Sequence, residues 1–173
     1  MKLLKLLPIF FIFFGISPFT NFAYSESVDP KNFKVLSNNN KKLSISNIEI
    51  FITEGDNFIE KGNFEKAKEK YDKARDLARQ LSGFYRDLNG SFREIDARIP
   101  LEMDKKGRES LKKWAKSNAR LVALYKRKKQ PEVSVPLLVE IIRLMSPNSK
   151  EGKEAYDDLI RLGFVDTPYK GFR

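Results

Sequence analysis

The sequence has neither histidine nor cysteine among its 173 residues. The first absence removes the imidazole group, the commonest acid or base of enzymes working near neutral pH. The second removes thiol nucleophiles, disulfides and the attachment site of a lipid anchor. Together they also remove the ligands of ordinary structural zinc sites. These absences exclude active sites built on imidazole or thiol groups, and an enzyme that uses carboxylates or lysines remains possible.

Four acidic residues near Pro100 are the remaining candidates for catalysis. They are Glu94, Asp96, Glu102 and Asp104. Two carboxylates can act as an acid–base pair or hold a hard metal ion. However, acidic residues also favour the first turn of a helix, because they stabilise its positive end. No spacing here indicates acid–base work, so we predict a protein that is not an enzyme and has no metal and no cofactor.

The start of the chain carries an apolar run of only 11 residues, 6–16, with two lysines before it. Ala23 and Ser25 follow, two positions apart, as at a signal-peptidase site. A helix that crosses a bilayer needs about 20 apolar residues. We therefore predict a cleaved Sec-type signal peptide at 1–25 and export to the periplasm or a thylakoid lumen. An uncleaved, membrane-associated segment stays as the alternative.

The rest of the chain divides into three parts. Residues 26–43 are polar and show neither a helical nor a strand period, which indicates a flexible leader. From 44 to 163, apolar residues recur at steps of three and four, which predicts an all-α domain. Residues 164–173 form a C-terminal tail.

A helical hairpin is predicted at the start of this domain. Ser46 and Glu49 have the spacing of a capping box, which opens the first helix. Gly62 and Asn63 break the chain after it, and the Asn63 side chain can cap the second helix. Two antiparallel helices joined by a short turn follow directly.

The spacing within this hairpin resembles the tetratricopeptide repeat, a helical pair of 34 residues with small and aromatic residues at fixed places. The matching residues are Phe51, Gly55, Phe58, Gly62, Ala67, Tyr71 and Ala74. We expect Gly55 and Ala67 to let the two helices approach closely, while Tyr71 fills the space beside them. The clear repeat covers residues 48–81.

Other parts match this family less well. Glu54 and Arg79 stand in place of the family's leucine and closing proline. One 34-residue step on, Tyr85, Leu88 and Phe92 repeat the pattern of the first helix without its second half. The resemblance implies about five to six helices in a short right-handed stack of antiparallel hairpins. The C-terminal half is also similar in organisation to small exported repeat proteins of photosynthetic bacteria.

A long helix is predicted from about residue 102 to residue 128, and we expect Trp114, the only tryptophan, to anchor it in the core. Between residues 105 and 129 the chain has eleven basic residues and one acidic residue, so its net charge of +10 is concentrated there. Eight of the basic residues would form a ridge opposite the apolar stripe: Lys105, Lys112, Lys116, Arg120, Lys126, Arg127, Lys128 and Lys129. This basic ridge is either an ordinary solvated face or a docking surface for an acidic protein or an anionic membrane. Export and the lack of a nucleic-acid motif argue against nucleic acid.

Two more helices are predicted after the long one. Either Pro131 or Pro136 suits the first turn of the next helix. Asn148 is expected to cap the last one, and Gly163 to end it in a left-handed conformation. Phe164 is then the apolar residue expected to pack back on the helix end.

Stacked helical hairpins expose a concave face that is lined by first helices and grips proteins or peptides. Here that face would include Glu49, Ile52, Asp56 and Ile59. We therefore predict an exported protein-binding adaptor or assembly factor, whose partner is another protein or a peptide with an acidic surface. Self-association into a homo-oligomer is also open. The alternative is a peripheral membrane protein that binds anionic lipid through the basic 105–129 helix.

Overall fold

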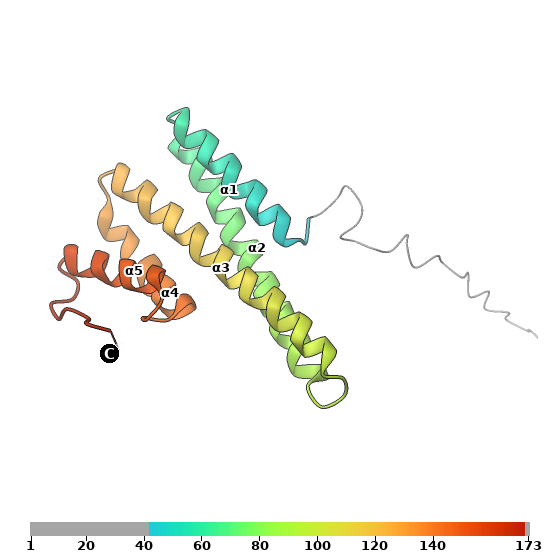
Figure 1. Ribbon diagram of the computed structural model, residues 1–173. Coiled ribbons are helices and arrows are strands. Elements are labelled where there is room, and N and C mark those ends of the chain that lie inside the picture. Colours follow the sequence, from blue (N-terminus) through green and yellow to red (C-terminus); the bar gives the residue numbers. More distant parts are fainter. Residues whose placement is uncertain (1–41, 172–173) are drawn as a thin grey trace, which may run out of the picture. The chain divides into compact units, whose positions relative to one another are not determined.

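The computed structural model describes residues 42–171 (Figure 1). These residues form five α-helices and no strand, so the predicted all-α class is confirmed. The helices are α1 (Ile45–Glu60), α2 (Phe64–Phe92), α3 (Arg98–Arg127), α4 (Val135–Met145) and α5 (Lys150–Arg161), with a short 3-10 helix, η2 (Pro131–Ser134), before α4. The predicted signal peptide and nearly all of the predicted leader lie outside the described residues. Among the described helices, none combines the length and the apolar character needed to cross a membrane.

The helix α1 begins earlier than the sequence pattern indicated. Its N-cap is Ser44, which has an extended backbone and whose side chain accepts a hydrogen bond from the Asn47 backbone N–H at 3.1 Å. The predicted capping box at Ser46 and Glu49 is therefore wrong by two residues. Both serines are chemically suited to the role, and the backbone conformation decides between them.

The turn between α1 and α2 follows the prediction. Gly62 has a φ of +71°, a conformation that favours glycine. The Asn63 N–H donates to the Phe58 carbonyl and the Gly62 N–H to the Ile59 carbonyl, which is the Schellman pattern. The Asn63 side chain then accepts a hydrogen bond from the Lys66 N–H at 3.1 Å and caps α2.

The predicted close approach of α1 and α2 is also confirmed. A Cβ atom added to Gly55 would lie 2.4 Å from Cε1 of the Tyr71 ring. Ala67 and Tyr71 are both buried, with 0% and 1% of their surfaces exposed. Any side chain at position 55 would therefore displace the ring or the helix.

The helix α2 continues without a break for 29 residues. A second 34-residue unit would need a turn near residue 81, but Tyr85 and Leu88 lie in the same helix as Tyr71. The similarly long α3 then packs along α2 (Figure 1). The first three helices thus form one short pair, α1 with α2, and one long pair, α2 with α3, and α4 packs on α3 and α5.

Three prolines lie at the beginnings of helical segments. Pro100 is in the first turn of α3, so this helix begins at Arg98, four residues earlier than predicted. Pro131 opens η2, and Pro136 lies in the first turn of α4. Proline suits all three places, because the N–H groups of a first turn have no partner within the helix.

The last helix is capped one residue later than predicted, at Ser149 in place of Asn148. The Ser149 hydroxyl accepts a hydrogen bond from the Gly152 N–H at 2.9 Å. The helix ends as predicted at Gly163, whose φ is +68°. The N–H of the following residue donates to the Leu159 carbonyl at 3.0 Å and completes a second Schellman pattern.

The tail after α5 is attached by a different aromatic residue than expected. The Phe164 side chain is 58% exposed and does not pack back on the helix end. Instead, the Tyr169 ring meets the Tyr156 ring edge-on, with centroids 6.0 Å apart. The Tyr156 hydroxyl also donates a hydrogen bond to the Thr167 carbonyl at 2.8 Å.

Two hydrophobic clusters hold the helices together. One joins α1, α2 and α3 and contains Ile48, Ile52, Ala74, Leu77, Ala78, Leu81 and Trp114. The other joins α2, α3, α4 and α5 and contains Ala67, Tyr71, Leu121, Val122, Leu124, Leu137, Leu138, Ile141, Ala155 and Leu159. Trp114 is 8% exposed, so its predicted place in the core is confirmed. The helices α2 and α3 contribute to both clusters and therefore link them.

Candidate functional site

The four residues predicted to line a concave face on α1 are turned toward the rest of the molecule. Ile52 is only 1% exposed and belongs to the first cluster, and Ile59 packs against the second. Glu49 and Asp56 both form ion pairs with α3. This face is therefore packed against α2 and α3.

Two lysines of α3 hold Glu49. Its carboxylate oxygens lie 2.6 Å from Lys113 Nζ and 2.5 Å from Lys116 Nζ. These two hydrogen bonds, helped by the lysine charges, lower the pKa of Glu49 although burial acts to raise it. The side chain is 38% exposed, so the contact is a surface ion pair reinforced by a second cation.

The Asp56 carboxylate interacts with a tyrosine of α2 and with an arginine of α3. The Tyr71 hydroxyl donates to Asp56 Oδ1 at 2.6 Å, and Arg120 Nε lies 3.0 Å from the same oxygen. Burial, followed by the hydrogen bond to Asp56, raises the pKa of Tyr71. The ring that packs against Gly55 is thus fixed at its polar end as well.

Half of the predicted basic ridge is paired with acids of the same chain. Two of its members reach α1, as described above. Lys128 Nζ lies 2.5 Å from Glu65 of α2, and Lys126 Nζ lies 2.6 Å from Asp158 of α5. Within residues 42–171, the other four members form no ion pair: Lys105, Lys112, Arg127 and Lys129. The ridge is therefore partly neutralised by acids of three neighbouring helices.

An open groove of about 660 Å³ lies along α3, with residues of α4 and α5 completing its lining. Its floor consists of small and apolar residues: Ala115, Ala119, Val122, Ala123, Ile141, Met145 and Ala155. Ala119 and Ala123 are exposed and lie one helical turn apart. Because their side chains end at Cβ, a bound segment can come close to the backbone of α3 there.

The two walls of this groove carry opposite charge. The α3 wall has Lys112, Lys113, Lys116 and Lys126 together with Glu109, and the α5 wall has Glu151, Glu154 and Asp158. The Lys126–Asp158 pair connects the walls at 2.6 Å. Burial acts to raise the pKa of Asp158, but hydrogen bonds from Lys126 and Arg161 outweigh it and the pKa is lowered. Of the other α3-wall lysines, Lys113 and Lys116 pair with Glu49 of α1, and within the described residues Lys112 forms no ion pair.

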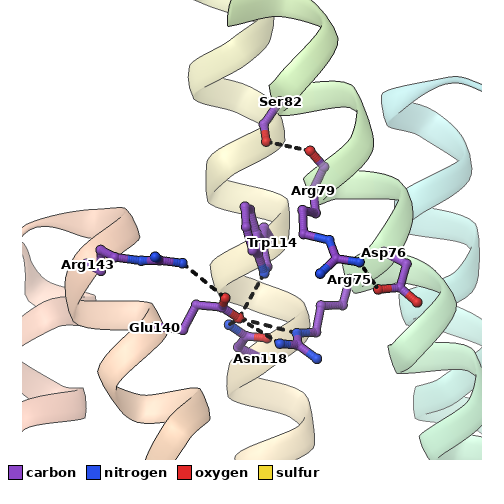
Figure 2. Close-up of polar contacts among 8 residues, drawn as sticks. All are labelled: Arg75, Asp76, Arg79, Ser82, Trp114, Asn118, Glu140 and Arg143. Carbon is purple, nitrogen blue, oxygen red and sulfur yellow. Dashed lines mark hydrogen bonds and ion pairs between the residues drawn. The ribbon is translucent and has the colours of Figure 1, made fainter.

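A largely buried carboxylate, Glu140, joins three helices (Figure 2). Its Oε2 accepts hydrogen bonds from Arg75 Nη2 of α2 at 3.0 Å, from Trp114 Nε1 at 3.1 Å and from Asn118 Nδ2 at 2.8 Å, the last two in α3. Arg143 Nη2 reaches Oε1 at 3.3 Å. Burial acts to raise the pKa of Glu140, but these donors and the Arg75 charge outweigh it and the pKa is lowered. With its oxygens occupied, this carboxylate is suited to holding helices together.

Glu140 was not predicted as a functional residue, although the sequence around it carries one signal. It is the only acidic residue in a helix whose other residues are mostly apolar. An acid in that setting indicates a buried, paired charge. Its partner Arg75 lies 65 residues earlier, and no local pattern connects the two.

Three of the four acidic residues near Pro100 pair with basic residues of their own segments, whereas Glu94 forms no ion pair within residues 42–171. Asp96 pairs with Arg98, Glu102 with Lys106, and Asp104 with Arg108. In the part of the chain that the structure describes, no group of three or more acidic side chains could hold a metal ion. Asp96 therefore acts at the beginning of α3, and Glu102 and Asp104 form pairs one turn apart within it.

Comparisons of the chain with protein-family models, with curated proteins and with solved structures gave no match.

Proposed function

We propose that this protein is a protein-binding adaptor or assembly factor without catalytic activity, and that its groove along α3 holds a segment of the partner. The observation that carries the proposal is the exposed alanine floor between two charged walls. Grooves with an apolar floor and polar rims are a common way to bind a peptide or a helix of another protein. The resemblance of residues 48–81 to the tetratricopeptide repeat favours the same class of function, and the predicted signal peptide would place it outside the cytoplasm.

The groove suits a protein segment better than a lipid surface. Anionic membranes attract clusters of unpaired cations. Here half of the basic ridge is paired within the chain, and Glu151 and Glu154 on the facing wall would repel anionic headgroups. A protein segment can instead present groups of both signs.

The proposal is tested by filling the groove. Ala119 is exposed, so the ring in Ala119→Phe would occupy the groove without displacing a core residue. We expect the variant to fold normally, by circular dichroism and Trp114 fluorescence, but to lose partner binding. The control is Ala97→Phe, which adds the same ring at another exposed alanine about 33 Å away, at the beginning of α3.

The measurement is affinity purification of the tagged full-length chain and both variants from the host, with quantitative mass spectrometry. Each recovered protein is then titrated in purified form against the three chains. A partner that binds the unmodified chain and Ala97→Phe, but binds Ala119→Phe at least about tenfold more weakly, supports the proposal. Equal binding to all three chains, or recovery of membrane alone, contradicts it.

A further inference from the structure

A second groove lies between the second half of α2 and the first half of α3. Its larger pocket, of about 490 Å³, has a floor of aromatic and aliphatic side chains from α2, α3 and α4: Tyr85, Met103, Leu111, Trp114 and Leu144. A smaller pocket of about 360 Å³ continues it toward the turn between α2 and α3, since Asn89 and Asp104 line both. We call the two pockets together the hairpin groove. It shares no lining residue with the groove along α3.

The turn at the end of this groove presents two large apolar side chains to solvent. Ile95 is 77% exposed and Leu101, in the first turn of α3, is 72% exposed, the highest values for large apolar residues in the described part of the chain. Leu101 also lines the smaller pocket. Exposed apolar side chains grouped in this way are typical of surfaces that bind another protein. One face of the molecule therefore carries an apolar pocket at one end and apolar projections at the other.

We infer that the hairpin groove is an interface between two copies of this chain, which lie antiparallel about a two-fold axis. In a two-fold interface each surface is complementary to itself, so a projection of one copy fills the pocket of the other and the reverse. Leu101 and Leu111 are about 15 Å apart along α3. An axis midway between them places Leu101 of each copy against the floor of the larger pocket in the other. Two paired helical hairpins also form a four-helix bundle, a common way to cover such surfaces.

The charges at the two ends of the groove favour the same arrangement. The larger pocket is bordered by three arginines and one acid: Arg86, Arg108, Arg143 and Asp104. Each arginine pairs with an acid of its own helix, but all three side chains are 70% or more exposed and are free to turn toward another acid. Residues 93–102 carry three acids and two arginines, and Glu94 is the one acid among them without an ion pair in the described chain. Antiparallel pairing brings Glu94 of each copy toward the arginines of the other.

A second copy accounts for more of this face than a small ligand does. An apolar ligand would fill the larger pocket but would leave Ile95 and Leu101 exposed. A second copy fills the pocket and covers both projections, and the two-fold axis makes each of these contacts twice.

The test is sedimentation equilibrium of the purified full-length chain over a range of concentrations. We expect a monomer–dimer equilibrium whose dissociation constant rises at least about tenfold in Leu101→Asp. Because Leu101 is exposed, the variant should keep the circular dichroism spectrum of the unmodified chain. The matched control is Ile50→Asp, which removes a 49% exposed apolar side chain from α1, outside the hairpin groove, and should dimerise like the unmodified chain.

A charge exchange tests the arrangement of the two copies. Arg86 and Glu94 do not pair within one copy, where Arg86 contacts Asp87. We expect Arg86→Glu and Glu94→Arg each to weaken dimerisation several-fold, because each places like charges opposite one another in both halves of the interface. The double variant Arg86→Glu/Glu94→Arg restores opposite charges across the interface and should recover most of the loss.

Three results would overturn the inference: a monomer at every concentration up to millimolar, a dimer that Leu101→Asp weakens no more than Ile50→Asp does, or a double charge variant as weak as the single ones. Ala119→Phe fills the groove along α3 and should leave dimerisation unchanged. The dimer and the proposed partner site can therefore fail independently.

Discussion

Both sides of α3 carry lysine or arginine side chains, but the two sides differ in how many of these side chains form ion pairs with a neighbouring helix. Toward α1 and α2, four of them lie 3.0 Å or less from acids of those helices: Lys113, Lys116, Arg120 and Lys128. Toward α5, acids stand across a groove, and within residues 42–171 the one ion pair between these helices is Lys126–Asp158. The side of α3 that faces α1 and α2 is packed, and we call it the closed side. The side that faces α5 carries the groove, and we call it the open side, although acidic and basic residues lie on both.

The residues beneath the charges explain the difference. Under the closed side lie buried isoleucines of α1, Ile48 and Ile52, in the first cluster. Under the open side lie the exposed alanines Ala119 and Ala123. An exposed ion pair contributes only about 0–1 kcal/mol, whereas burying one large apolar side chain contributes about 1.5–3 kcal/mol. Packing therefore brings the helices together, and the charges pair where packing has already placed them.

The largest effect on this arrangement is expected where α4 is attached to α2 and α3. Glu140→Ala leaves the Arg75 guanidinium and the Trp114 N–H without their acceptor. Because the remaining groups stay partly buried, we expect the free energy of unfolding to fall by about 3 kcal/mol. Urea unfolding followed by circular dichroism measures it. Glu132→Ala, at an exposed acid in η2, should change it by less than about 0.5 kcal/mol, and equal losses in the two variants would contradict the role of Glu140.

The next largest effect on stability is expected at Gly55, where α1 and α2 are in close contact, and Gly83 provides the control. In Gly55→Ala the new Cβ meets the Tyr71 ring at 2.4 Å, and we expect a loss of about 2 kcal/mol. Gly83→Ala lies in α2 with nothing within 4 Å of the new Cβ, so its lower backbone entropy in the unfolded chain should stabilise the protein by about 0.7 kcal/mol. Thermal unfolding of both variants should therefore shift in opposite directions. A shift of the same sign would show that α1 and α2 are not in close contact at Gly55.

A smaller effect is expected at the end of α3. Lys129 has a φ of +58° and occupies the place in its helix end that Gly163 occupies after α5. Lysine in this left-handed conformation is strained by its Cβ, so Lys129→Gly should raise the free energy of unfolding by about 1 kcal/mol. The reciprocal variant Gly163→Lys should lower it by a similar amount. Both are read from denaturant midpoints, and a destabilised Lys129→Gly would contradict the conformation of this residue.

The smallest effect is the pH dependence of the Glu49 pair. Because the pKa of Glu49 lies below its ordinary value of 4.5, the pair stabilises the fold above that pH, and its contribution is lost as pH falls through the lowered pKa. The side chain is more than one third exposed, so the contribution is below about 1 kcal/mol. Unfolding of the unmodified chain and Glu49→Gln, measured from neutral to acidic pH, should show a gap that closes below pH 4.5. A difference in stability between the two chains that persists at acidic pH would contradict an origin in the ionised Glu49 carboxylate.

The start of the domain could be predicted closely because its signals are local. Gly62 and Asn63 specify their turn through their own backbone and side-chain chemistry, and Gly55 is small at a helix crossing. The beginning of α1 was misplaced because Ser44 and Ser46 offer the same hydroxyl. The unbroken length of α2 was not predicted, because the clear repeat was taken to end at residue 81.

The candidate site could be predicted only in part, because its contacts join distant parts of the chain. The lysines of the long helix were identified by their clustering. Their partners were not, since Lys113 and Glu49 are 64 residues apart and Lys126 and Asp158 are 32 apart. The groove exists only once α4 and α5 have packed against α3, and no helical period of a single segment shows it.

Site-specific photo-crosslinking in the host tests the central claim most directly, namely that the alanine floor is the binding face. A photoreactive amino acid is placed at Ala123 in the groove or at Thr53, an exposed residue of α1. We predict a discrete protein adduct from Ala123 that disappears when Ala119→Phe is added, and none from Thr53. An adduct from Thr53 alone, or an Ala123 adduct that survives Ala119→Phe, would contradict the account.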